Sequence, residues 1–166
     1  MEIRDLYDVN RKLTGETIEK GQKVPLGRYY VTVIAFIENS DGKFLIQKRS
    51  KKEENDKSKW ASTGGHVKSG ERSKKGIQTE IKEEIGIDID INKLELFKTI
   101  KTEDDFVDLY YVKENFKEED MILEEDEVET ARWLSIDEIK DLIESKEFSE
   151  SHAEFFYDCL EYLDRE

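Results

Sequence analysis

Three glutamates stand close together near the middle of the chain: Glu80, Glu83 and Glu84. In an α-helix, residues three and four positions apart lie on the same side, so a helix here would present all three carboxylates together. No lysine or arginine stands three or four positions from any of them. Hard divalent cations such as Mg²⁺ and Mn²⁺ bind oxygen ligands of this kind. The spacing indicates a metal site; the alternative is an acidic helix face that contacts only water.

A helix is predicted over Glu71 to Ile85 to carry these acids. Ile77, Ile81 and Ile85 recur at intervals of four, which forms one apolar stripe for packing against another element. Gly86 follows the last isoleucine, at the position where a left-handed cap ends many helices. The helix therefore has one apolar side and one acidic side.

Two glycines, Gly64 and Gly65, precede this helix. They are expected in a short loop that follows a strand at residues 60–63. Glycine there permits unusual backbone angles and the close approach of a ligand or metal ion to a backbone carbonyl. A tight turn with no ligand is the alternative interpretation.

The stretch from Gly65 to Ile87 resembles the Nudix box, whose pattern is G-x5-E-x7-R-E-U-x-E-E-x-G-U with U an aliphatic residue. Every fixed position matches except one, because Thr79 stands where the family has arginine. The resemblance implies that residues 1–166 form a single Nudix domain with its box at 65–87. It also implies an α/β fold, an α/β/α sandwich around a central mixed sheet.

The resemblance further implies which residues bind metal. Glu80, Glu83 and Glu84 match the family's metal-binding acids, and the cofactor would be Mg²⁺ or Mn²⁺. Gly64 matches a position whose carbonyl can complete the metal shell. The family's arginine supports the first glutamate of the trio, so Thr79, with a hydroxyl and no charge, leaves the orientation of Glu80 open.

Catalytic and substrate-binding roles follow in the same way. One acid of the cluster, Glu80 or Glu83, is expected to activate the attacking water, or else the outlying Glu127, which resembles an acid found in that loop in some family members. Arg49, at the end of a predicted strand, is a candidate contact for a substrate phosphate, unless it only faces water. His66 is expected to touch phosphate, to bind metal or to form a hydrogen bond within its loop.

A second resemblance covers residues 8–17, 45–50 and 64–67, which look like the Nudix branch related to isopentenyl diphosphate isomerase. That isomerase has a cysteine where this chain has Gly64, and the single cysteine here is Cys159. The resemblance therefore implies a pyrophosphohydrolase acting on a nucleoside diphosphate derivative or a similar small diphosphate, and argues against the isomerase. A non-catalytic Nudix-fold binding or sensor module is the alternative, favoured by Thr79.

Composition limits the partners. A net charge of −14 and a pI near 4.7 argue against nucleic acid or an anionic membrane as the main partner. One cysteine permits no internal disulfide, and the amino terminus lacks the apolar core of a signal peptide, so a cytoplasmic location is expected. A chain of 166 residues suffices for one domain. Its oligomeric state does not follow from the sequence.

Alternating and helical patterns predict the remaining elements. A turn is expected at residues 11–15. Strands are expected at residues 5–8, 29–38, 43–47, 94–102, 108–113 and 129–134. Helices are expected at residues 136–145 and 150–163, and the first of them begins with a capping box formed by Ser135 and Glu138.

Overall fold

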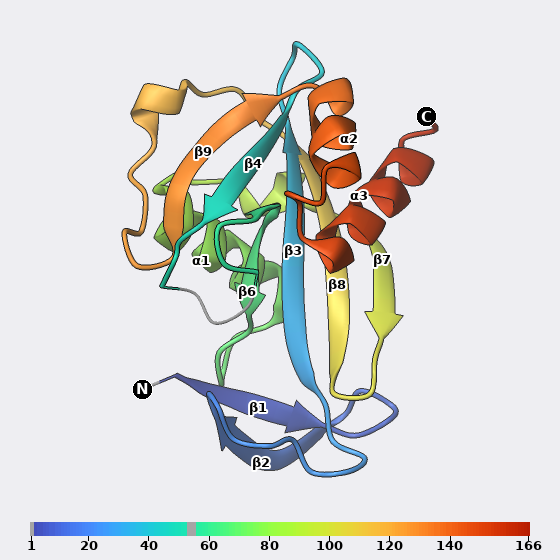
Figure 1. The fold of residues 1–166 in the computed structure, drawn as a ribbon. Helices are drawn as coiled ribbons and strands as arrows, with labels where there is room; N and C mark the ends of the chain where they lie inside the picture. The colour runs from blue at the N-terminus through green and yellow to red at the C-terminus, as the bar shows by residue number, and fades with distance from the viewer. Residues whose placement is uncertain (1, 53–55) are drawn as a thin grey trace.

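The structure, a computed structural model, describes residues 2–52 and 56–166. Within them a seven-stranded sheet forms the centre of the fold (Figure 1). Its strands are β3 (Tyr30–Glu38), β4 (Phe44–Arg49), β5 (Trp60–Ala61), β6 (Thr63–His66), β7 (Glu95–Lys101), β8 (Asp105–Lys113) and β9 (Val128–Leu134). Strands β3 and β8 pair in parallel and the other pairs are antiparallel, so the predicted mixed sheet is confirmed.

Alternation along β3 produces two hydrophobic faces. Val31 and Val33 point to the face that packs against helix α1 (Ser73–Ile85). Ile34 and Phe36 point to the opposite face, where α3 (Glu150–Tyr162) packs together with α2 (Ile136–Glu144). Because successive side chains of a strand alternate between faces, one strand contributes to both cores. The predicted sandwich, with helices on both sides of the sheet, is confirmed.

Helix α1 has the predicted apolar stripe, since Ile77, Ile81 and Ile85 are all fully buried. The helix begins two residues later than predicted, at Ser73. It ends at Gly86, whose φ of 73° places it in the left-handed region and whose N–H donates to the Lys82 carbonyl. The C-terminal cap is therefore confirmed.

The strand predicted at residues 60–63 is divided into β5 and β6, and the other predicted strands and helices are present, with ends that differ by at most three residues. The capping box of α2 is formed, with Ser135 and Glu138 each accepting the other's backbone N–H. Two short 3-10 helices, Ile91–Lys93 and Glu118–Asp120, lie in the connections. In the described part of the chain, no helix combines the length and the apolar character needed to cross a membrane.

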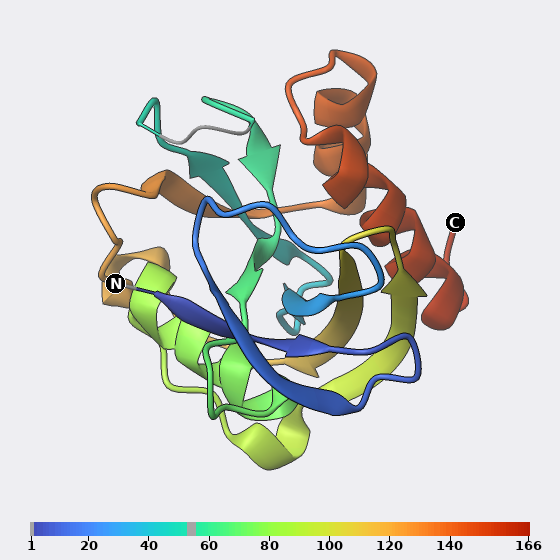
Figure 2. The ribbon, with the colours of Figure 1, turned by 90° about the horizontal axis from the view of Figure 1, so that it is seen from below.

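The amino-terminal segment differs from the prediction of a turn at residues 11–15. Strands β1 (Ile3–Tyr7) and β2 (Leu13–Glu19) pair as an antiparallel hairpin that lies across one end of the central sheet (Figures 1 and 2). Tyr7 exchanges two backbone hydrogen bonds with Tyr29, of 2.7 and 3.0 Å. The turn lies earlier than predicted, at residues 8–12, where Arg11 has a φ of 60° and donates its N–H to the Asp8 carbonyl, and strand β2 then begins at Leu13.

The loop prediction for Gly64 and Gly65 was also wrong. Both glycines belong to β6 and pair with Ile34 and Val33 of β3. A Cβ at Gly64 would lie 2.5 Å from the Val33 carbonyl oxygen, so only glycine permits this strand to lie so close to β3. The two glycines therefore lie in a paired strand beside the helix and allow it to pack closely against β3; they do not form a free loop.

Candidate active site

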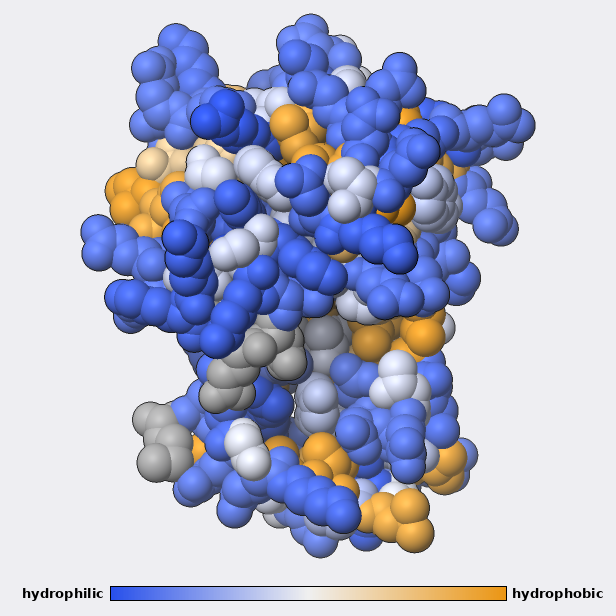
Figure 3. All heavy atoms as spheres, viewed as in Figure 1, coloured by the Kyte–Doolittle hydropathy of each residue, from blue (hydrophilic) through white to orange (hydrophobic). Residues whose placement is uncertain are grey.

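A cleft of about 430 Å³ lies between the amino-terminal hairpin, β6 and α1. In the space-filling view the mostly hydrophilic surface is hollowed above the hairpin (Figure 3). The residues that line the cleft are Glu2, Arg4, Lys20, Arg49, Lys52, Gly64, Gly65, His66, Glu80, Glu84, Asp126 and Glu127. Most of the residues that the sequence singles out thus meet in one place, with Glu83 the exception.

Two of the helix glutamates are buried at the floor of this cleft. Glu80 is 8% exposed and Glu84 is 4% exposed. Burial, with the charge of Glu83, raises the pKa of Glu80 to about 8. Burial, with the charges of Glu80 and Glu127, raises the pKa of Glu84 well above its usual range. Acidic groups held this way take up a cation readily, because buried charge is stable only when it is neutralised.

Glu84 is held by two weak donors on neighbouring strands. The Gln47 side-chain amide and the Gly64 N–H each donate to its Oε1, at 3.3 Å. The opposite end of the Gln47 amide, Oε1, is buried and has no hydrogen-bond partner among the described residues. Within the described segments, Glu84 thus has only two long hydrogen bonds, and a buried oxygen acceptor on Gln47 has none, a donor-poor environment that suits a hard cation.

Glu80 lies against the backbone of Gly65. A Cβ built at Gly65 would lie 2.5 Å from the Glu80 carboxyl carbon and from its Oε2. The missing side chain at Gly65 thus makes room for the carboxylate. This contact explains why glycine is required at the first position of the box.

Glu83 forms an ion pair of 2.6 Å with Lys68, and its charge still acts on Glu80. Lys68 lies between β6 and α1, outside the helical spacing at which the sequence shows no basic neighbour. Within residues 2–52 and 56–166, no three His, Cys, Asp or Glu side chains are arranged to hold a metal ion. The sequence shows no basic neighbour of Glu83 at helical spacing, but the fold supplies one in Lys68.

Thr79, at the position of the family's arginine, does not contact Glu80 through its hydroxyl. Its Oγ1 donates to Glu71 Oε2 at 3.0 Å. Thr79 thus links helix α1 to Glu71, the glutamate of the box that precedes the helix. The orientation of Glu80 is set by its burial against Gly65 instead.

His66 lines the cleft from β6. Burial, followed by the positive charges of Arg4, Lys20 and Arg49, lowers the pKa of His66 to about 3, so its imidazole is neutral near pH 7. Its Nδ1 lies 3.3 Å from the Thr32 hydroxyl. Three cations around a neutral ring favour contact with an anion over ligation of a metal ion.

Arg49 and Glu127 come from segments that meet at the upper edge of the cleft. Arg49 ends β4, and the next residue, Ser50, donates its N–H to the Glu127 carbonyl at 3.0 Å. The charge of Glu127 contributes to the raised pKa values of both Glu80 and Glu84, which places its carboxylate near theirs. The loop before β9 therefore brings a further acid to the two buried glutamates.

Sequence reasoning missed the cations that the hairpin supplies. Arg4 is 8% exposed, with its guanidinium 5.0 Å from the centre of the Tyr30 ring, and Lys20 follows β2. Lys52, also missed, lines the cleft and pairs with Asp126 at 3.1 Å. No local pattern in the sequence marks these residues, because the hairpin and the segment after β4 that carries Lys52 come together only in the tertiary fold.

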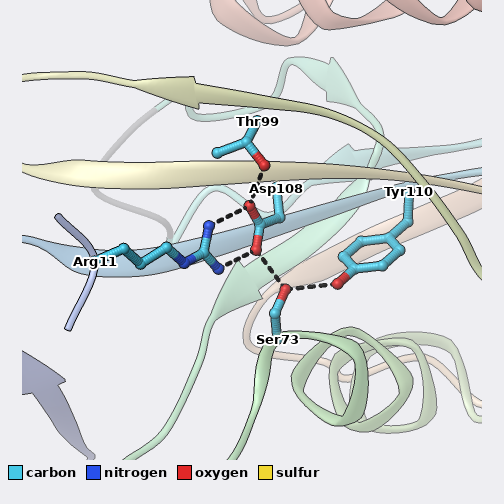
Figure 4. Close-up of polar contacts among 5 residues, drawn as sticks. All are labelled: Arg11, Ser73, Thr99, Asp108 and Tyr110. Carbon is cyan, nitrogen blue, oxygen red and sulfur yellow. Dashed lines mark hydrogen bonds and ion pairs between the residues drawn. The ribbon is translucent and has the colours of Figure 1, made fainter. Parts of the chain in front are cut away.

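A buried ion pair connects the hairpin to the sheet and to α1 (Figure 4). Asp108 of β8 has no exposed surface and accepts both guanidinium donors of Arg11, at 2.8 and 2.5 Å. Ser73, the first residue of α1, and Thr99 of β7 donate to the same carboxylate at 2.5 and 2.7 Å. Burial alone would raise the pKa of Asp108, but these donors lower it overall. One carboxylate thus fixes the hairpin relative to the acidic helix.

Cys159 is distant from the cleft. It is fully buried in α3, in the core on the sheet face opposite α1. Burial raises the pKa of its thiol to about 12. This cysteine therefore cannot replace the one that the isomerase resemblance requires beside His66.

The fold and the cleft together define a class of protein. It is an α/β/α sandwich in which helix α1 presents buried acids to a cleft that is also lined by basic residues. The chain belongs to the Nudix family, since the model of the NUDIX domain matches residues 28–159. An uncharacterized Nudix hydrolase of Listeria monocytogenes is 34% identical over 149 residues, which covers 89% of this chain and 88% of that protein. The predicted family and the assignment to Nudix hydrolases are confirmed.

Solved structures show the same fold. Protein DR0079 of Deinococcus radiodurans superposes with a TM-score of 0.76 and 21% identity, covering 95% of this chain and 99% of that one. A bifunctional NMN adenylyltransferase/ADP ribose pyrophosphatase from Francisella tularensis, complexed with AMP and a manganese ion, superposes with a TM-score of 0.67 and 19% identity. That match covers 86% of this chain and 43% of the bifunctional protein.

Proposed function

We propose that the protein is a divalent-metal-dependent pyrophosphohydrolase. It cleaves the diphosphate linkage of a nucleoside diphosphate derivative by attack of water at phosphorus. The observation that carries the proposal is the cleft itself, where the buried acids Glu80 and Glu84 face the cations Arg4, Lys20 and Arg49. A diphosphate needs both kinds of group, since cations neutralise its charge and a carboxylate removes a proton from water.

The residues on the floor of the cleft suit Mg²⁺ or Mn²⁺. Glu80 and Glu84 would hold the ion, with the Gly64 carbonyl as a further oxygen ligand and Glu83 joining after it leaves Lys68. When bound, such an ion neutralises charge on the phosphate oxygens and lowers the pKa of a bound water. The ADP ribose pyrophosphatase of similar fold, which contains manganese, is consistent with this assignment.

The chain's own side chains supply the rest of the reaction. Arg4, Lys20 and Arg49 orient the diphosphate, and neutral His66 donates a hydrogen bond to it. Glu127 lies close enough to Glu80 and Glu84 to affect their protonation, so it can accept the proton of the attacking water. Glu80 or Glu83 can accept this proton instead when the ion is held by the other acids. The phosphate group opposite the attacking water leaves as the new phosphorus–oxygen bond forms.

We also propose that residues 1–166 act as one domain. The hairpin precedes the matched region of 28–159 but contributes cleft residues and is tied to the core through Arg11 and Asp108. The resemblance to the branch of the diphosphate isomerase is consistent with a diphosphate ligand. Isomerisation itself is disfavoured, because Gly64 occupies the cysteine position.

A binding module without catalysis is the second candidate. It is favoured by Thr79 in place of arginine and by the ion pair of Glu83 with Lys68, which occupies one of the three acids. The two candidates differ in turnover but not in ligand binding. They can therefore be separated by a single activity measurement.

The test is hydrolysis of a panel of diphosphates, including ADP-ribose and other nucleoside diphosphate derivatives, with Mg²⁺ or Mn²⁺. We expect metal-dependent release of a nucleoside monophosphate. The double variant Glu80→Gln, Glu84→Gln should reduce it at least about a hundredfold, a loss typical of removing groups that stabilise a transition state. Ligand binding without turnover, under all metal conditions, would favour the binding module instead.

A further inference from the structure

A second cavity, of about 650 Å³, lies beside the cleft at the end of the hairpin. It is enclosed by β2, the segment 22–26 that follows it, Tyr30 and the turn between β7 and β8. We call it the hairpin pocket. Its volume falls within the roughly 300–1,000 Å³ of small-molecule sites.

The hairpin pocket adjoins the cleft. Arg4 lines both cavities, so its side chain lies at the boundary between them. Tyr30, in the wall of the hairpin pocket, has its ring centre 5.1 Å from that of His66 in the cleft. A molecule whose diphosphate occupies the cleft therefore has its next group at the entrance of the hairpin pocket.

One wall of the pocket is apolar. Val24, Pro25 and Leu26 form it together with Ile18, which is 6% exposed. Leu26 is 96% exposed, so its side chain is fully available to a ligand. An apolar wall of this kind suits the flat face of a nucleobase, which gains free energy when both surfaces leave water.

The opposite wall is acidic. Glu19, Glu103 and Asp104 contribute carboxylates, against the positive charges of Arg4 and Lys23. Three acids and two bases leave one net negative charge, which repels additional phosphate groups. Carboxylates accept hydrogen bonds from hydroxyl groups, so this wall suits a neutral ligand that carries hydroxyls, such as ribose.

We propose that the hairpin pocket binds the nucleoside half of the substrate, with the base on the Val24–Leu26 wall and the ribose hydroxyls on the acidic wall. The inference rests on the proposed function, because it assigns the cleft to the diphosphate. Arg4 and the segment from Ile18 to Leu26 precede the matched family region of 28–159. Part of the proposed pocket, including Leu26, thus lies before the residues that the family model matches.

The first test uses protein labelled with ¹³C at leucine methyl groups, titrated with the four ribonucleoside 5′-monophosphates and separately with inorganic phosphate. We expect at least one nucleotide to shift the Leu26 methyl signals, while phosphate alone leaves them in place. The methyl signals of Leu13, exposed on the same hairpin but outside the pocket, serve as the internal reference and should not move.

The second test measures affinity for the nucleotide that binds best. Leu26→Ser should weaken it about fivefold, because apolar contact with the base is lost, and should leave affinity for inorganic phosphate unchanged. Leu13→Ser is the matched control and should alter neither affinity. Since Leu26 is exposed, its substitution leaves the fold intact.

The outcomes separate the two proposals. Metal-dependent hydrolysis with no Leu26 shift for any nucleotide would overturn the pocket assignment and leave the hydrolase standing. A Leu26 shift in a protein that hydrolyses no diphosphate would support the pocket and contradict the proposed reaction. Equal loss of nucleotide affinity in Leu26→Ser and Leu13→Ser would also overturn the pocket assignment.

Discussion

At the scale of single residues, positions 64 and 65 each require glycine, but for different reasons. Gly65 leaves space for the Glu80 carboxylate, whereas Gly64 leaves space for the backbone and side chain of β3. A carboxylate at the end of a flexible side chain can move aside, but a paired strand cannot. The same substitution should therefore damage function at one position and folding at the next.

We predict that Gly65→Ala folds normally and lowers kcat at least tenfold, because Glu80 is displaced from the site. Gly64→Ala should instead lower the free energy of unfolding by about 2 kcal/mol, a magnitude typical of overpacking. Urea unfolding of both variants, with activity at saturating metal, tests this pair. Similar stability losses in the two variants would contradict the distinction.

The raised pKa of Glu80, about 8, has a consequence for metal binding. Without metal, this group stabilises the fold at pH values below its unfolded pKa of roughly 4.3, and that contribution is lost as the pH rises toward 8. A metal ion binds the ionised carboxylate, so binding near pH 7 must release a proton. Glu84, with its pKa also raised, adds to the same effect.

We therefore predict that Mg²⁺ binds more tightly as the pH rises from 6 to 8, with proton release at pH 7. Titration calorimetry in two buffers of different ionisation enthalpy measures the protons directly. The Glu80→Gln variant should release fewer. Binding heats that are independent of the buffer would show that both carboxylates are already ionised before metal binds.

At the scale of elements, the hairpin contributes Arg4 and Lys20 to a cleft whose other residues come from later segments. Arg11 of the hairpin binds the buried Asp108, which also accepts a hydrogen bond from Ser73 at the start of α1. Asp108 is therefore one of several contacts that set the position of Arg4 on the hairpin relative to Glu80 on the helix. The others include the backbone pairing of Tyr7 with Tyr29 and the hydrogen bonds that Asp5 accepts from the segment before α1.

We predict that Arg11→Met lowers the free energy of unfolding by about 2 kcal/mol, because it leaves Asp108 buried without its cation. This value is below the range for fully buried pairs, since the Arg11 side chain is 32% exposed. Arg28→Met, which removes an exposed ion pair with Glu16 of the hairpin, should cost much less. Denaturant unfolding of the two variants measures both losses. Equal losses in the free energy of unfolding would contradict the role of Asp108.

The sequence predicted α1 well because its signals are local: an isoleucine every fourth residue and a glycine at the end. It did not predict that Gly64 lies in a strand, because the pairing with Ile34 is visible only in the fold. Lys68 was missed as the partner of Glu83 for the same reason, since a residue 15 positions away meets the helix only after the chain turns.

At the scale of the whole molecule, the proposed function requires a strongly acidic protein to bind an anionic substrate, which a few cations gathered in one place would attract. The net charge of −14 would repel a diphosphate from most of the surface. Arg4, Lys20, Arg49 and Lys52 lie together around the buried acids. Four cations from distant parts of the sequence thus stand among the five carboxylates of the cleft, Glu2, Glu80, Glu84, Asp126 and Glu127, a grouping that composition alone could not reveal.

The most direct test of the central claim is hydrolysis of ADP-ribose, or of the best substrate from the panel, in ¹⁸O-labelled water. We expect one ¹⁸O atom in a single phosphate product, because water attacks phosphorus, and no labelled product without Mg²⁺ or Mn²⁺. The Glu80→Gln, Glu84→Gln variant should abolish the incorporation. Label in a non-phosphate product, or equal incorporation in the variant, would contradict a metal-dependent attack on phosphorus at these glutamates.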